Sequence, residues 1–317
     1  MTKEIRRLEA RSGVCGGATV LSAFDQGSSG LRRRGDCDGL IRRETASSPV
    51  LAGTRGESCL PPVAARAFAP LLYADWMRAV FIHFEVEPEL LQGQVPFALD
   101  LWQGKAIVSL VAFTMERLRP RIGGLLGELA FKPIATTHFL NIRTYVRHRA
   151  EPGIYFMAEF LSNRLFVRLG RPTFGLPYRF GDLVYGRDCG DGAVEGTVTA
   201  AGGGRRLTYQ ARLDSAAEPQ ESRPGTLDFF LLERYAGFTC DGVKRRRFRI
   251  WHPAWRQVRI EPLVQDEGLL ATTGGWIGHA RLVKGNYSAG VRGVWMGWPV
   301  RIHPVEPRRR LTVFFEG

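Results

Sequence analysis

The residues best suited to chemistry in this sequence alternate along one stretch, 139–146, with apolar residues between them. Asn141, Arg143 and Tyr145 fall on one face of a predicted strand, because successive side chains of a strand point to opposite faces. Glu159 follows in the next predicted strand and is the natural partner of Arg143. A buried arginine needs compensation for its charge. Arg143 could therefore bind a ligand carboxylate through paired hydrogen bonds, or it could form a structural cross-strand ion pair with Glu159.

Other catalytic patterns are scarce. The six histidines show neither the HxH nor the HxxxH spacing of a zinc site, and the chain has no GxSxG stretch and no phosphate loop ending in GKS or GKT. His252, in WHPAW, is the best single candidate, because flanking aromatic residues favour a half-buried imidazole that could transfer protons. The alternative is a packed histidine bonded to backbone. We predict no metal and no cofactor.

Short strands and turns must position these residues. Residues 77–86, 105–113, 135–148 and 153–160 are predicted strands, the last two forming a hairpin. In the last of them, alternation places Ile154, Phe156, Ala158 and Phe160 on one face and Tyr155, Met157 and Glu159 on the other. Further strands are predicted at RLFVRLG (164–170), AVEGTVTA (193–200), RRLTYQARL (205–213), FRIWH (248–252), QVRIEPL (257–263) and VRGVWMGWPVRIH (291–303).

Helices are predicted in only two places. Pro88 opens a short helical turn over 88–96, and Thr226 can cap a clear helix over 225–238. About ten short strands with few helices indicate a mainly β (α+β) fold, a long antiparallel meander curled into a partly closed barrel with few free edges.

Composition narrows the class of protein. The chain has 317 residues, of which 44% are hydrophobic, and a formal net charge of +13. Much of that charge lies near the two ends, so we predict no nucleic-acid partner. No apolar run reaches the length of a membrane span, and we predict no membrane partner. The five cysteines form no CxxC pair and no apolar signal segment opens the chain, so reduced thiols and a cytoplasmic location are expected.

The chain divides into three parts. Residues 1–73 lack a sustained period and are rich in Gly and Ser, so we expect a disordered or wrongly included N-terminal extension. Residues 74–306 are expected to form a single β domain, and 307–317 a basic C-terminal tail.

Several short stretches between residues 76 and 306 resemble those of a known protein family. They are FLNIRTYV (139–146), PGIYFMAEFLSNRL (152–165), GLPYRF (175–180), PGTLDFFLLERY (224–235) and WHPAW (251–255), with YSAGVRGVWMGWP (287–299) a weaker mark. In order and spacing they resemble the YqjF-like family of bacterial proteins, domain of unknown function 2071. That family in turn is similar to the acetoacetate decarboxylase-like superfamily, which implies a cone-shaped barrel.

The resemblance also raises a question about chemistry. In the decarboxylases a strand, a Gly-Arg pair, a small residue and a proline precede two lysines. The first lysine forms a Schiff base, and the second lowers its pKa by like-charge proximity. Gly170-Arg171, Gly175 and Pro177 match this frame, but Tyr178-Arg179 stands in place of the lysines. A phenol forms no imine and an arginine stays charged, so a lysine-imine decarboxylase is not expected.

Three functions remain open at this point. The first is a protein that binds a small anionic molecule with an apolar body inside the barrel, with Asn141, Arg143, Tyr145, Glu159, Arg171, Tyr178 and Arg179 as candidate ligand-binding residues. The second is a lyase-type enzyme acting on a keto acid or related carboxylate, using arginine to hold the carboxylate and Tyr178 or His252 to transfer protons. The third is a structural or interaction protein whose barrel is filled by side chains. A cavity of a few hundred Å³ around Tyr178 and Arg143 would favour the first two.

Overall fold

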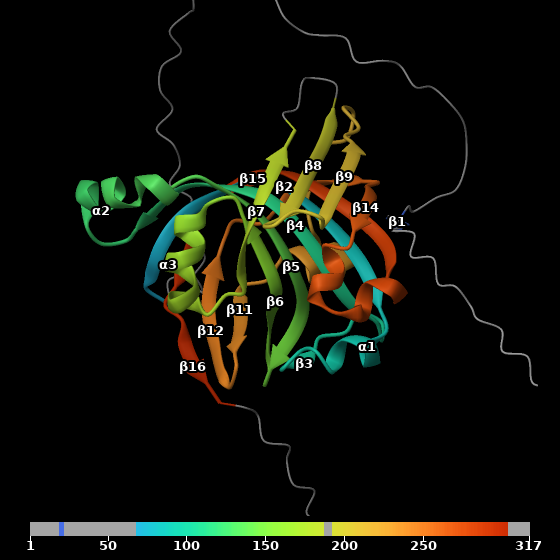
Figure 1. Cartoon of the computed structure of the whole chain (residues 1–317), viewed down its shortest axis with the longest axis horizontal. Coiled ribbons are helices and arrows are strands. Elements are labelled where there is room, and N and C mark those ends of the chain that lie inside the picture. Colours follow the sequence, from blue (N-terminus) through green and yellow to red (C-terminus); the bar gives the residue numbers. More distant parts are fainter. Residues whose placement is uncertain (1–18, 22–67, 187–191, 304–317) are drawn as a thin grey trace, which may run out of the picture.

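The computed structural model describes residues 19–21, 68–186 and 192–303. The fold of this part of the chain is mainly β, as the sequence predicts (Figure 1). The helices that it contains are α1 (Pro88–Gln92), α2 (Gly124–Phe131), α3 (Arg164–Phe174), α4 (Leu227–Leu232) and the 3-10 helices η2 (Lys132–Ile134), η3 (Leu270–Thr273) and η4 (Gly275–His279).

Seven strands close a ring around an apolar interior. They are β2 (Pro70–Val86), β4 (Ala106–Pro120), β5 (Thr137–His148), β6 (Glu151–Leu161), β11 (Ala236–Asp241), β12 (Lys244–Trp251) and β15 (Arg281–Gly297). Pairing runs from β5 through β6, β11, β12, β15, β2 and β4 back to β5. The β6–β11 and β12–β15 pairings are short, so the ring is not a regular barrel.

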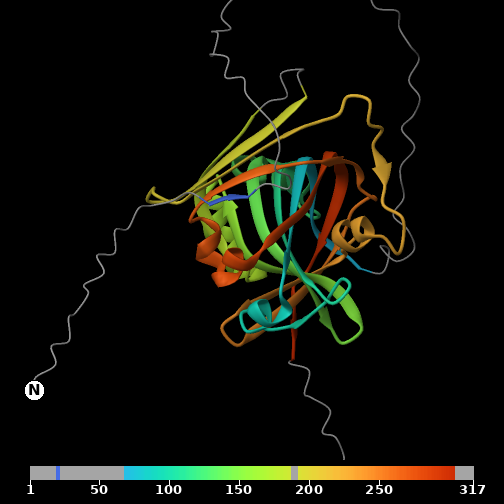
Figure 2. The ribbon, with the colours of Figure 1, turned by 90° about the vertical axis from the view of Figure 1, so that its right-hand side faces the viewer.

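A second group of strands extends from the ring at β6. It comprises β7 (Tyr178–Tyr185), β8 (Ala193–Ala200), β9 (Arg206–Arg212), β14 (Leu263–Glu267) and β1 (Thr19–Leu21). Figure 2 shows β8 and β9, in yellow, reaching beyond the ring. Because β7 and β11 both pair with β6 in the parallel sense, the sheet is mixed rather than purely antiparallel. The remaining strands are the short β3 (Ala98–Leu99), β10 (Gln220–Glu221), β13 (Arg256–Ile260) and β16 (Val300–Ile302).

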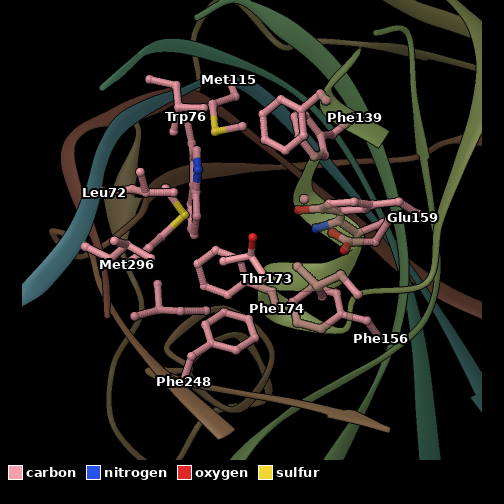
Figure 3. Close-up of a pocket in the computed structure, with 18 of the residues that line it drawn as sticks. Leu72, Trp76, Met115, Phe139, Phe156, Glu159, Thr173, Phe174, Phe248 and Met296 are labelled. Carbon is pink, nitrogen blue, oxygen red and sulfur yellow. The ribbon is translucent and has the colours of Figure 1, made fainter. Parts of the chain in front are cut away.

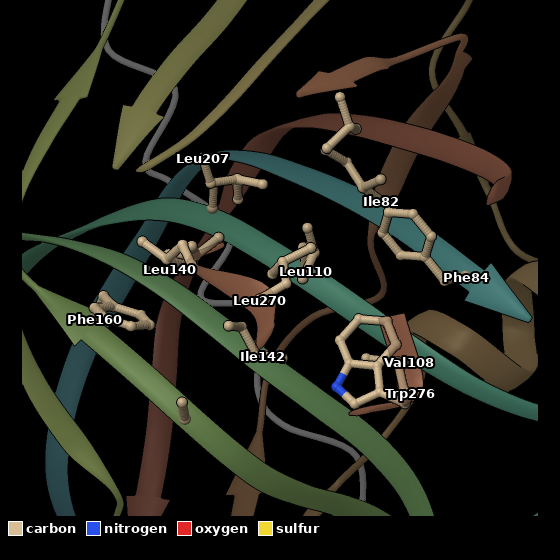
Figure 4. Close-up of a cluster of buried hydrophobic side chains, with 14 of the residues drawn as sticks. Ile82, Phe84, Val108, Leu110, Leu140, Ile142, Phe160, Leu207, Leu270 and Trp276 are labelled. Carbon is tan, nitrogen blue, oxygen red and sulfur yellow. The ribbon is translucent and has the colours of Figure 1, made fainter. Parts of the chain in front are cut away.

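One hydrophobic core packs against the outer face of the ring. Figure 4 shows Leu110, Leu140 and Phe160 from β4, β5 and β6 facing Leu207 of β9 and Trp276 of η4. This core fixes which side chains of each ring strand point outward, and the alternating ones must point into the ring.

The ends of the chain lie mostly outside the described residues. That holds for most of the predicted extension 1–73 and for the tail 307–317. Inside the predicted extension, β1 pairs with β14, and β2 begins at Pro70, before the predicted domain boundary. Among the described residues, no helix is both long and apolar enough to cross a bilayer.

The prediction of a strand over 164–170 was wrong, because this stretch forms the first part of α3. The side chain of Asn163 caps the helix by accepting a hydrogen bond from the amide of Phe166 (3.1 Å). Gly175 ends it in the left-handed conformation (φ 68°), which glycine adopts without strain. These end signals override the apolar run RLFVRLG, which resembles a strand when it is considered alone.

The predicted helix 225–238 is shorter than expected. Thr226 caps it as predicted, but α4 ends at Leu232 and residues from Ala236 onward form β11. Arg234 forms a buried ion pair with Asp100 (2.7 Å), so the chain leaves the helix where tertiary contacts outweigh helical preference.

A β-bulge changes which side chains of β6 point into the ring. Ile142 of β5 pairs with Ala158, but Arg143 pairs with Phe156, so Met157 is the extra residue. The simple alternation predicted for 153–160 therefore fails at Met157. Phe156 and Glu159 both face the ring interior, on either side of the bulge.

Candidate functional site

An apolar cavity of about 410 Å³ lies inside the ring. Figure 3 shows Trp76, Phe139, Phe156, Phe174 and Phe248 around it. These side chains come from four ring strands and from α3, so the cavity depends on closure of the ring. A space of this size bounded by aromatic rings suits a small molecule with an apolar body.

Three polar side chains form one row at the wall of the cavity. Asn141 of β5 is the register partner of Glu159 of β6, which is in turn the register partner of Tyr178 of β7. Residues directly opposite each other on neighbouring strands share a face. All three line the cavity, and the side-chain oxygen of Asn141 has no hydrogen-bond partner among the described residues.

Arg143 lies two residues from Asn141 on the same face and is only 8% exposed. Its guanidinium donates to the carbonyl oxygen of Leu231 (3.3 Å) and lies over the ring of Phe81 (5.9 Å). Its Nε has no hydrogen-bond partner, and none of the salt bridges among the described residues involves it. The suggested ion pair with Glu159 is therefore not formed, and the guanidinium that lines the cavity has no anionic partner within the part of the chain that the structure describes.

Glu159 is buried in a setting that favours its neutral form. Burial raises the pKa of Glu159 well above its usual range, against the opposing pull of the Arg143 guanidinium. Its Oε2 has no hydrogen-bond partner among the described residues. Burial therefore favours the carboxylic acid form of Glu159, which can donate a proton or a hydrogen bond.

Tyr178 packs tightly against the helix that precedes it. Its ring contacts those of Phe139 and Phe166, and a Cβ added to Gly170 would lie 2.4 Å from it. Burial, reinforced by nearby Glu159, raises the pKa of Tyr178 well above its usual range, so its hydroxyl stays neutral. Gly170 thus belongs to the Gly-Arg frame for a steric reason: it makes room for Tyr178.

The other candidate residues lie away from the cavity. Tyr145 is buried beyond it, and its hydroxyl donates to the carbonyl of Leu231 (3.0 Å). Arg171 is exposed on α3. Arg179 points to the opposite face of β7, where it donates to the hydroxyl of Thr272 (2.7 Å). The buried ring of His252 lies between those of Trp76, Tyr235 and Trp255. The cavity wall does not include the candidates Tyr145, Arg171, Arg179 and His252.

The lysines of the described residues also lie elsewhere. Lys105 pairs with Glu87 and Lys284 with Asp228, while Lys132 and Lys244 are exposed. None of the described residues that line the cavity is a lysine.

Sequence reasoning missed two features of the site. The first is the carbonyl oxygen of Leu231, which accepts hydrogen bonds from both Arg143 and Tyr145. No local pattern reveals it, since a stretch nearly ninety residues away supplies the oxygen. The second is the aromatic wall, whose residues look like ordinary strand residues until the ring closes.

Comparisons with known proteins agree with this geometry at the level of family and fold. A family model described as "Uncharacterized conserved protein", domain of unknown function 2071, matches residues 73–291. The protein YqjF of Bacillus subtilis (strain 168), described as uncharacterized, is 30% identical over 188 residues, which cover 58% of this chain and 74% of that protein.

Solved structures share the fold at low sequence identity. An acetoacetate decarboxylase-like enzyme from Sphingomonas wittichii RW1 superposes with a TM-score of 0.53 at 14% identity, covering 75% of this chain and 95% of its own. Acetoacetate decarboxylase from Legionella pneumophila gives 0.52 at 12% identity, covering 80% and 98%. The enduracididine biosynthesis enzyme MppR complexed with pyruvate gives 0.53 at 12%, covering 80% and 99%. These likenesses establish an acetoacetate decarboxylase-like fold, and fold alone does not assign an activity.

Proposed function

This chain belongs to the family of uncharacterized conserved proteins whose model matches residues 73–291, and we propose that it binds a small carboxylic acid with an apolar body inside the ring. The observation that carries the proposal is the charge of Arg143, which forms no ion pair with any of the described residues. A buried cation without a partner costs several kcal/mol, whereas a ligand carboxylate would compensate that charge.

The state of Glu159 strengthens the case for an external anion. Were Glu159 ionised, it would supply the negative charge that Arg143 needs. Because burial raises the pKa of Glu159 and favours its neutral form, an anionic ligand is better placed to supply that charge. A neutral Glu159 and the amide of Asn141 could each hydrogen-bond a second ligand oxygen.

The wall of the cavity determines the chemical character of the rest of the ligand. Aromatic and aliphatic side chains surround the space away from the polar row, so that part of the ligand must be apolar. The cavity itself argues against a filled interior. No lysine is needed for this function.

The test compares a carboxylate with a matched neutral molecule. Decanoate and decanol share an alkyl body, so their difference in affinity, measured by isothermal titration calorimetry, reports the carboxylate contact. We expect the full chain to bind decanoate at least about tenfold more tightly than decanol, the value of one charge-assisted hydrogen bond. The variant Arg143→Met should lose that preference while still binding decanol.

A matched control keeps the test specific to the cavity. Arg179→Met removes a nearby arginine that faces away from the cavity, and it should keep the parent's preference for decanoate. Equal binding of decanoate by the parent and by Arg143→Met would contradict the proposal.

A second candidate function rests on Glu159 itself. With a keto acid held by Arg143, the ionised form of Glu159, made a stronger base by its raised pKa, could take a proton from the carbon next to the carbonyl, leaving an enolate, and then return a solvent-derived proton to that carbon. An enzyme of similar fold has been solved in complex with pyruvate, so pyruvate is a reasonable first substrate to test. In deuterium oxide, NMR should then show loss of the methyl proton signal with the parent chain but not with Glu159→Gln. If the parent chain loses the methyl proton signal no faster than buffer does, only the binding function remains supported.

A further inference from the structure

Helix α2 carries the most exposed apolar surface near the cavity. Figure 1 shows it projecting from the body of the fold. The apolar surface here called the α2 face consists of Ile122, just before the helix, and of Leu125, Leu126 and Leu129 on it, which are 62–82% exposed. Large contiguous apolar surfaces of this kind mark interaction sites, because their exposure to water is unfavourable.

The α2 face adjoins the mouth of the cavity. Four residues both line the cavity and are exposed: Ala130 of α2, Leu169 and Thr173 of α3, and Trp298 after β15. Trp298 is 61% exposed. Whatever covers the α2 face therefore also covers the entrance to the cavity.

The charges around this surface indicate what covers it. Five exposed basic residues stand on α2, α3 and the segments flanking α2, against one exposed acidic residue, Glu128: they are Arg121, Lys132, Arg164, Arg168 and Arg171. Within the described residues none of the five has a carboxylate partner in a salt bridge. The α2 face is thus an apolar surface with exposed basic residues near it.

A second copy of this chain is a poor match for such a surface. A twofold dimer applies the same patch to itself, so basic residues would face basic residues. An anionic lipid surface supplies both features that the patch needs, negative headgroups for the basic residues and an acyl boundary for the leucines. Exposed tryptophan is also favoured at that boundary.

We propose that the α2 face and the mouth of the cavity dock onto the surface of an anionic lipid bilayer. With eight residues α2 is too short to span a membrane, so it would lie in the interface. The absence of a long apolar run led the sequence analysis to predict no membrane partner, but that criterion detects only spanning segments. Docking does not depend on the proposed ligand.

The test is sedimentation of the full, ligand-free chain with vesicles of phosphatidylcholine alone or mixed with phosphatidylglycerol. We expect binding to the mixed vesicles and weak binding to the neutral ones, with the difference lost at high salt. Leu125→Ser/Leu126→Ser should weaken binding at least about tenfold, since two buried leucines are lost. Arg121→Glu/Lys132→Glu should weaken binding to the anionic vesicles only.

Matched controls test whether binding depends on the α2 face or on any exposed apolar or basic residue. Val243, at the turn between β11 and β12, is 94% exposed, and Val243→Ser should bind vesicles as the parent does. Arg223→Glu/Arg259→Glu, a reversal of two exposed basic residues elsewhere, should retain more binding than Arg121→Glu/Lys132→Glu. All of these variants should melt close to the parent, because the changed side chains are exposed.

Two results would overturn the proposal. If the leucine variant binds vesicles as tightly as the parent does, another part of the chain must be responsible for the binding. A dimer in analytical ultracentrifugation that dissociates in the leucine variant, together with no vesicle binding, would identify a second copy as the occupant.

Discussion

Glu159 and Tyr178 are register partners on adjacent parallel strands, and both side chains line the cavity. The amide of Glu159 donates to the carbonyl of Pro177 (3.2 Å), which fixes the start of β7 against β6. The next pair along the same strands, Phe160 and Arg179, faces the other side of the sheet, where the guanidinium lies over the ring (5.7 Å). One strand pairing therefore decides that position 178 faces the cavity and position 179 does not.

The first prediction concerns Glu159 and pH. The pKa of Glu159 is raised in the folded protein, whereas in the unfolded chain it is about 4.3. As the pH rises, the unfolded chain releases this proton first, so the stabilising contribution is complete below about pH 4.3 and declines toward the folded pKa. Glu159→Gln cannot titrate. In urea titrations, its free energy of unfolding should rise relative to the parent's by about 1.4 kcal/mol per pH unit inside that window.

A control of opposite sign accompanies this prediction. The hydrogen bonds from Arg206 lower the pKa of exposed Glu267, so its contribution is present above the unfolded pKa and declines as the pH falls. Glu267→Gln should therefore lose stability relative to the parent as the pH rises through that range, by a small amount because the pair is exposed. Parallel stability curves for Glu159→Gln and the parent would show that Glu159 ionises normally.

The second prediction contrasts two buried arginines. Arg143 has no ion-pair partner among the described residues, so Arg143→Met removes an uncompensated buried charge and should leave the free energy of unfolding unchanged or raise it. Arg234 forms a buried pair with Asp100, and Arg234→Met leaves that carboxylate short of one partner, with Arg147 remaining. Its cost should be about 3 kcal/mol. Urea unfolding at neutral pH measures both, and equal losses would indicate that Arg143 has an anionic partner in the free protein.

Much of this arrangement could be predicted from the sequence, and the remainder depends on contacts distant in the chain. Strict alternation along β5 correctly separated Leu140 and Ile142 from Asn141 and Arg143. Alternation failed in β6 because the bulge at Met157 is set by pairing with β5, which no local pattern encodes. The strand predicted at 164–170 became α3 because capping by Asn163 and Gly175 outweighs the apolar run.

The third prediction tests the steric role of Gly170. A Cβ at this position would lie 2.4 Å from the ring of Tyr178, so the ring or the helix must shift. Strain of about 1–3 kcal/mol should exceed the helical gain of about 1 kcal/mol for Gly170→Ala, giving a lower melting temperature and weaker decanoate binding. Gly93→Ala is the control, because nothing lies within 4 Å of its Cβ and its φ of −65° suits alanine. That variant should be as stable as the parent or slightly more so.

The fourth prediction asks whether restoring the lysine pair of the decarboxylases restores imine chemistry. In Tyr178→Lys/Arg179→Lys the first amine would lie in the cavity and the second on the opposite face near Thr272. Without a second ammonium beside it, the amine at 178 lacks the like charge that lowers its pKa in the resembling enzymes. Glu159, its register partner, would instead ionise and pair with it, keeping it protonated and poorly nucleophilic.

Borohydride reduction in the presence of acetoacetate, followed by intact-protein mass spectrometry, measures this directly. We expect no trapped adduct at neutral pH with the parent or with the double variant. Adding Glu159→Gln removes the anionic partner, so the triple variant should trap acetoacetate, and more so as the pH rises toward the lysine's pKa. An adduct already present in the double variant at neutral pH would mean that the cavity lowers the pKa of this lysine without a second cation, and that Glu159 does not pair with it.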